Sequence, residues 1–157
     1  MPISIKYHFT QAFNVPVQKT FDWCTNFNLN DHQLMGEQNA KREIINLANG
    51  ALILKDTFHL STEVVEKQKL VRLYPEKYTW TSTHLNGPNK YSQFLYELAS
   101  VGKESSILDF SGLHLEYQRI IDEKLLTQKL CKEDAKAWKL LAKAMEKEIG
   151  SKKVNDR

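Results

Sequence analysis

One carboxylate of this chain lies among apolar side chains, which makes it the residue best placed to do chemistry. The segment 51–60 alternates, and its more apolar face carries Leu52, Leu54, Asp56, Phe58 and Leu60. We expect that face to point inward and to take Asp56 with it. A buried carboxylate must be paired, hydrogen-bonded or protonated. Asp56 is therefore a candidate general base and equally a candidate member of a structural network, with Arg72 as its candidate counter-charge.

The other residues that could ligate a metal or act as nucleophiles form no recognisable pattern. No two histidines have the i, i+4 spacing of a helical zinc site, and Cys24 and Cys131 have no partner at metal-ligand spacing. A Gly-x-Ser-x-Gly motif and a glycine-rich phosphate loop are also missing from the sequence. We predict no metal and no cofactor, and we interpret both cysteines as small buried side chains.

Hydrophobic periodicity predicts the elements that must position these residues. Residues 3–13 alternate as a half-buried strand, a short helix follows Pro16 and ends within 26–30, and Asp31 caps a second short helix that stops at Gly36. Six more strands are predicted at 41–48, 51–60, 66–74, 77–85, 91–101 and 105–117, with Asn49-Gly50 as a tight hairpin turn. An amphipathic helix covers 122–149 and ends at Gly150.

Seven antiparallel strands that share one apolar face need a second layer to cover it. The long helix offers a matching apolar stripe. We therefore predict an α+β helix-grip fold, in which a curved seven-stranded antiparallel sheet wraps around the C-terminal helix and two short helices follow the first strand. One domain is expected over 1–150, with a basic polar tail at 151–157.

Composition and charge exclude several classes of function. The 157 residues carry a net charge of +3, from 22 basic and 19 acidic side chains. Lysines alternate with glutamates on the last predicted helix, which is typical of a solvated face and not of a nucleic-acid surface. No signal pattern and no apolar stretch of about 20 residues is present. We expect a cytoplasmic protein, monomeric or weakly dimeric, without a membrane span or a nucleic-acid partner.

The order of the elements resembles the START-like superfamily, which includes the birch-pollen-allergen fold and the polyketide cyclase and lipid-transport families. The resemblance extends over about 3–149 and is carried by the first strand running into Phe-Asn-Val-Pro at 13–16 and Phe-Asp-Trp at 21–23. It implies a hydrophobic cavity between sheet and helix, because known members bind lipids, sterols or polyketides and a minority catalyse cyclisation. The glycine-rich loop of the plant members is reduced here to Asn49-Gly50, so functions of that loop are not carried over.

Strand parity names the residues that would line such a cavity. The inward-facing candidates are Leu54, Asp56, Phe58, Tyr78, Trp80, His84, Phe94, Tyr96 and Phe110, with Trp138 and Leu141 facing them from the long helix. Beyond Gly112 the facing stays open: His114 points inward if parity holds, and Leu113 and Leu115 do so if Gly112 marks a bulge. An aromatic stripe of this kind fits a filled core as well as a pocket.

Three functions fit this interpretation. The first is binding or transport of a hydrophobic small molecule, lipid-like or polyketide-like, which requires a cavity but no positioned acid or base. The second is a cyclase or hydrolase in which Asp56 works with Tyr78 or His84. The third is a co-chaperone-like interaction module with a filled core and an exposed patch on the outer face of the sheet. We prefer the first because it requires least of the sequence, and whether a reaction is catalysed stays open at this level.

Overall fold

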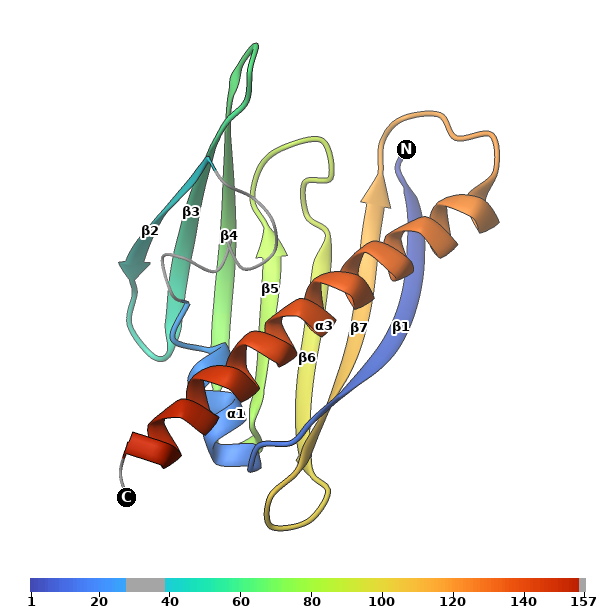
Figure 1. Cartoon of the computed structure of the whole chain (residues 1–157). Helices are drawn as coiled ribbons and strands as arrows, with labels where there is room; N and C mark the ends of the chain where they lie inside the picture. Colours follow the sequence, from blue (N-terminus) through green and yellow to red (C-terminus); the bar gives the residue numbers. More distant parts are fainter. Residues whose placement is uncertain (28–38, 156–157) are drawn as a thin grey trace.

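The chain folds as a curved antiparallel sheet that grips one long helix (Figure 1). The computed structural model describes residues 1–27 and 39–155. Its strands are β1 (Ile3–Phe13), β2 (Ala40–Asn46), β3 (Ala51–His59), β4 (Val64–Tyr74), β5 (Thr79–His84), β6 (Gln93–Ser100) and β7 (Ser106–Glu116), in the spatial order β1-β7-β6-β5-β4-β3-β2. Helix α1 (Val17–Cys24) follows β1, and helix α3 (Glu123–Asn155) runs across the concave side of the sheet. The predicted helix-grip fold is confirmed.

The alternation of the first strand decides which side of the sheet is buried. Ile5, Tyr7 and Phe13 are buried on the concave face, while Lys6 and His8 are exposed on the other. β1 pairs with β7 along its whole length, from Ile3↔Glu116 to Phe13↔Ser106 in antiparallel register. The first strand of the chain therefore joins the edge of the sheet that the last strand forms.

The β2–β3 hairpin differs by one residue from the tight turn that Asn49-Gly50 predicts. Both residues have positive φ, 61° and 74°, as expected. However, the Leu47 amide donates to the carbonyl of Ala51, so the loop contains three residues, 48–50, and the ladder starts at Asn46↔Leu52. Three-residue loops with a left-handed residue are the next most common hairpin connection after two-residue loops. This shift in register decides which residue of β2 lies opposite Asp56.

Helix α1 is fixed at one end of the sheet by buried hydroxyl groups. Thr20 Oγ1 and Ser106 Oγ on β7 are 2.9 Å apart, and Ser106 Oγ donates to the carbonyl of Val15 at 2.9 Å. Trp23 Nε1 donates to Glu148 of α3 at 2.8 Å. α1 is thus held between the sheet and α3. The second short helix predicted at 31–35 lies outside the described residues.

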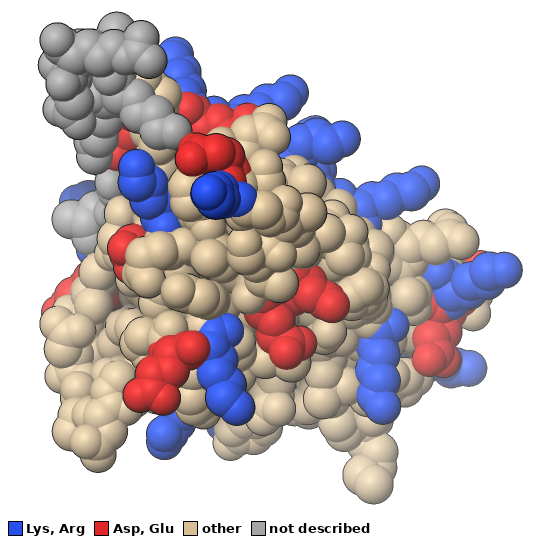
Figure 2. Space-filling view, turned by 90° about the horizontal axis from the view of Figure 1, so that it is seen from below, with Lys and Arg blue, Asp and Glu red and all other residues tan. Residues whose placement is uncertain are grey.

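Helix α3 supplies the layer that the concave face requires. Leu141, Ala142 and Met145 are buried against the sheet, and Lys143 on the other side of the helix is exposed. The helix continues through Gly150 to Asn155, whereas the sequence predicted an end at Gly150. Within the described part of the chain, no helix is both long and apolar enough to cross a membrane. Basic and acidic side chains are interspersed on the face shown in Figure 2.

Gly112 creates the space that the Tyr7 ring occupies. The two residues are direct neighbours across the β1–β7 ladder. A Cβ on Gly112 would lie 2.8 Å from two atoms of that ring, which is closer than any ordinary contact. The ladder passes Gly112 without a bulge, so parity holds and His114, two residues later, points inward and is buried. This settles the facing that the sequence left open.

We predict that Gly112→Ala lowers the free energy of unfolding by about 1–3 kcal/mol, because the added methyl forces the Tyr7 ring to move. Chemical denaturation monitored by far-UV circular dichroism measures this change. Gly150→Ala is the matched control, since its Cβ meets nothing within 4 Å and alanine favours a helix. Equal stability of the two variants would show that the Tyr7 ring tolerates a methyl group at residue 112.

Candidate functional site

A cavity of about 460 Å³ lies between the concave face of the sheet and α3. Its walls come from β1 through β7, from the end of α1 and from the middle of α3. Pockets for small molecules typically have volumes of about 300–1,000 Å³ and a mostly apolar lining with a few placed polar groups. The lining here combines a wall of aromatic rings with several ionisable side chains.

The aromatic wall is a continuous set of ring contacts over β5, β6 and β7. Trp80 and Tyr96 stack at 4.8 Å with their planes 3° apart, and Tyr96 meets Phe110 edge-on at 5.2 Å. Trp138 of α3 contacts both Trp80 and Tyr96, at 6.3 and 5.8 Å. Such pairs contribute beyond the area that they bury. The wall is thus a set of mutually packed rings that offers an apolar surface to a ligand.

Tyr7 and Asp134 form the polar contact between β1 and α3. The Tyr7 hydroxyl donates to Asp134 Oδ2 at 2.5 Å, and both residues line the cavity. Burial raises the pKa of Asp134, against the opposing effect of the Tyr7 hydrogen bond. Burial and the neighbouring carboxylate raise the pKa of Tyr7 well above its ordinary value. Asp134 is therefore a carboxyl group whose affinity for a proton is increased and which faces the cavity.

Three cations line the cavity from β2 and β4. Arg42 is on β2, and Lys67 and Lys69 point the same way from β4 because they are two residues apart. Lys67 Nζ lies 5.3 Å above the ring of Phe58. Burial lowers the pKa of Lys69, and the charges of Arg42 and Lys67 act in the same direction. Asp56, the ion-pair partner of Arg42, acts in the opposite direction, so this side of the cavity combines three basic groups with one carboxylate.

Two histidines also line the cavity. Burial lowers the pKa of His84 to about 4, the charge of Lys69 contributes to that effect, and His84 Nδ1 is 3.2 Å from the side-chain oxygen of Asn89. His84 is therefore a neutral imidazole at physiological pH. His114 Nε2 is 2.8 Å from Glu116, and this hydrogen bond lowers the pKa of the Glu116 carboxyl. Within the described residues, no group of three potential metal ligands converges.

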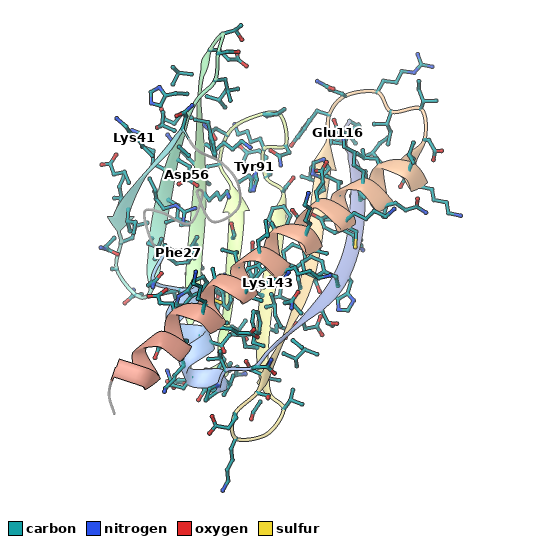
Figure 3. The ribbon with its side chains drawn as sticks, in the orientation of Figure 1. Phe27, Lys41, Asp56, Tyr91, Glu116 and Lys143 are labelled. Carbon is teal, nitrogen blue, oxygen red and sulfur yellow. The ribbon has the colours of Figure 1, made fainter. Side chains whose placement is uncertain are left out.

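Asp56 is buried as predicted, but its partner and its place differ from the prediction. Arg42 Nε and Nη2 donate to its two carboxylate oxygens at 2.7 and 3.1 Å, and both side chains are inaccessible or nearly so, at 0% exposure for Asp56 and 6% for Arg42. Figure 3 shows Asp56 on β3, one strand in from the edge. Arg72, the predicted counter-charge, is exposed. Asp56 itself does not line the cavity, whereas its partner Arg42 does.

The structure brings most of the predicted site residues together. The cavity is lined by Leu54, Trp80, His84, Phe94, Tyr96, Phe110, Trp138 and Leu141. Phe58 and Tyr78 do not line it. Phe58 lies next to the far end of β3, beneath Lys67. Tyr78 precedes β5 in a left-handed conformation after the 3₁₀ turn η1 (Pro75–Lys77), and its ring packs on Phe21 of α1 instead.

Sequence reasoning missed Tyr7, Arg42, Lys67, Lys69 and Asp134. Two of them carried a usable signal. Asp134 falls between Cys131 and Trp138 at steps of three and four, so it lies on the apolar stripe of the helix. Lys69 shares the parity of Val71, which is buried. Arg42 could not be placed without the three-residue loop that sets its register.

We predict that Asp56→Asn costs about 3–5 kcal/mol in the free energy of unfolding, because it removes the buried carboxylate charge to which the Arg42 guanidinium donates two hydrogen bonds. Urea denaturation tests this, and the double variant Arg42→Met/Asp56→Leu should recover much of the loss. Glu66→Gln is the control, since the Lys55–Glu66 pair at 3.3 Å is exposed and its removal should leave stability close to that of the wild type. A small effect of Asp56→Asn would mean that the pair is not required for folding.

The fold is shared with several solved structures at low sequence identity. An aromatase/cyclase (Zhui) from Streptomyces sp. R1128 matches with a TM-score of 0.73 and 10% identity, over 94% of this chain and 96% of that one. Norcoclaurine synthase from Thalictrum flavum matches at 0.70 and 14%, over 96% and 88%. Ara h 8.0201 matches at 0.70 and 13%, over 91% and 98%. No protein-family model matches the sequence, and no curated protein matches it either.

These neighbours define the class of the fold. The chain has the helix-grip fold that these structures share, as the order of its elements predicted. Proteins with this fold include ligand-binding proteins and cyclases, so the fold does not choose between these functions. At identities of 10–14% the likeness extends to the architecture alone. The choice of function depends on the residues of the cavity.

Proposed function

We propose that this protein binds a hydrophobic small molecule in the cavity between its sheet and α3. The observation that carries the proposal is the cavity itself, about 460 Å³ in volume and walled on one side by the stacked Trp80, Tyr96 and Phe110. This volume suits a ligand of two fused rings or a medium-length acyl chain. The rings are held by one another and by Trp138, so little has to reorganise when a ligand enters.

The structural neighbours support a small-molecule role for this architecture. One of them is an aromatase/cyclase, and another, norcoclaurine synthase, was solved in complex with dopamine and hydroxybenzaldehyde.

Two of the three functions considered from the sequence lose support. An interaction module was expected to have a filled core, and here a cavity is present. An enzyme built on Asp56 needs a free carboxylate in the cavity, whereas Asp56 is bound by Arg42 outside it.

We predict that Leu54→Trp weakens binding of the neutral fluorescent probe N-phenyl-1-naphthylamine by at least about tenfold, because the larger side chain fills the cavity. Leu54 is 3% exposed and lines the cavity from β3. Fluorescence titration measures the dissociation constant. Ala137→Phe fills the same cavity from α3 and serves as the second variant if Leu54→Trp disturbs folding.

Leu140→Trp is the matched control, since Leu140 is 38% exposed and is not a lining residue. It should bind the probe as the wild type does. Far-UV and near-UV circular dichroism check that each variant is folded. If folded Leu54→Trp and Ala137→Phe proteins both retain full affinity, the probe binds elsewhere and the cavity is not the binding site.

A second candidate function, acid–base catalysis in the same cavity, is favoured by Asp134. This carboxyl faces the cavity, accepts a 2.5 Å hydrogen bond from Tyr7, and has a pKa that burial raises. A carboxyl tuned in this direction can both take and return a proton. A cyclisation or condensation of an aromatic substrate would use such a group, with the aromatic wall holding the substrate.

The ring-closing condensation of dopamine with phenylacetaldehyde tests this second function. If Asp134 is a proton carrier, the wild type accelerates product formation above buffer, measured by mass spectrometry, and Asp134→Asn lowers the rate by about 100-fold or more. Probe binding should be unchanged in that variant. Product formation by the wild type at the buffer rate would leave binding as the function that the cavity supports.

A further inference from the structure

Lys69 lines the cavity without an ion-pair partner in the part of the chain that the structure describes. It lies on the inner face of β4, opposite Leu54 of β3 and His84 of β5 in the sheet register. It lines the cavity and is only partly exposed. Across 1–27 and 39–150, its Nζ makes no hydrogen bond to another side chain and has no carboxylate within 4 Å. An ammonium group in such surroundings is unfavourable unless an anion accompanies it.

The two carboxylates whose charges attract Lys69 are already engaged by other groups. Asp56 is held by the two-point contact of Arg42, and Asp134 accepts the short hydrogen bond of Tyr7. Both attract Lys69 at longer range, while Arg42 and Lys67 oppose its charge. The charges of Lys69 and Lys67 also contribute to the lowered pKa of His84. Neither carboxylate forms an ion pair with Lys69, which is left as a hydrogen-bond donor that faces the cavity.

The cationic side and the aromatic wall lie at a distance that one small molecule can span. Lys69 is opposite His84, and Trp80 is four residues along β5 from His84. Four residues of a strand cover about 13 Å. A molecule with a charged group at Lys69 and an apolar body on Trp80 and Tyr96 would therefore occupy both parts. The two features together describe an amphipathic ligand with one polar end.

We propose that the cavity recognises an anionic group, such as a carboxylate, sulfonate or phosphate, at Lys69, with Lys67 adding to the attraction. The ligand class is then an organic acid with an aromatic or aliphatic body, and not a neutral sterol or hydrocarbon. This inference rests on the proposed function, because it names the chemistry of the ligand in the same cavity. Charge-assisted hydrogen bonds to a buried ammonium are stronger than neutral ones and add selectivity as well as affinity.

Two fluorescent probes that differ in one sulfonate test the proposal. 8-Anilino-1-naphthalenesulfonate carries the anion, and N-phenyl-1-naphthylamine is the same naphthalene with the same phenylamino group but without the sulfonate. We expect Lys69→Met to weaken binding of the sulfonate by about tenfold or more and to leave the neutral probe within about twofold of the wild type. Lys69→Arg, which keeps the charge, should retain the preference for the sulfonate.

Lys41→Met is the matched control, because Lys41 is next to Arg42 but exposed on the opposite face of β2 (Figure 3). It should change neither dissociation constant. If Lys69→Met leaves the affinity for the sulfonate unchanged, or weakens both probes equally, Lys69 is not an anion site and the proposal is overturned. If neither probe binds the wild type, or if Leu54→Trp weakens the binding of neither probe, the proposed cavity function fails as well. Failure of the anion site alone is therefore distinguishable from failure of the cavity function.

Discussion

The structure depends on one geometric constraint: a single helix has to cover the concave face of seven strands. Strands lie about 4.8 Å apart, so this sheet is roughly 29 Å across, whereas a helix with its side chains is about 10–12 Å wide. α3 cannot touch the whole face, even though it runs across it obliquely (Figure 1). The uncovered part has to be filled by large side chains, closed by α1, or left hollow. All three occur here: the side chains of Phe13 and Phe110 fill part of the uncovered face, α1 closes one end of it, and the part that stays hollow is the cavity.

The hollow part determines the electrostatics of the interior. A filled apolar core would exclude Lys67, Lys69, His84 and Asp134, because each side chain would lose its hydrogen bonds to water and gain none in exchange. The cavity allows these groups to sit inside the outline of the protein while remaining short of full burial. As a result, the pKa of Asp134 is displaced upward from its ordinary value, and the pKa values of Lys69 and His84 are displaced downward. Such displaced groups gathered around one space are typical of binding and catalytic sites.

The sequence predicted the fold and the inner face of most strands, because alternation with a period of two reports facing directly. Trp80, Tyr96 and Phe110 were placed by this rule alone. The errors have local causes. Tyr78 leaves the strand pattern because η1 turns the chain before β5. Arg42 was missed because a loop of three residues, in place of two, moves it opposite Asp56. A one-residue change in register is invisible in composition, yet it determined whether Asp56 was a free base or half of a buried ion pair.

The pairing of β1 with β7 has a consequence for how the chain reaches this state. β2 to β7 form a meander in which consecutive strands pair with each other, but the partner of β1 lies about a hundred residues later in the chain. α3, which covers the concave face, comes later still. Closing so long a loop is slow compared with forming hairpins. A nascent chain therefore exposes the aromatic wall until its last elements have left the ribosome, and during that interval the residues that would receive a ligand are equally open to a chaperone.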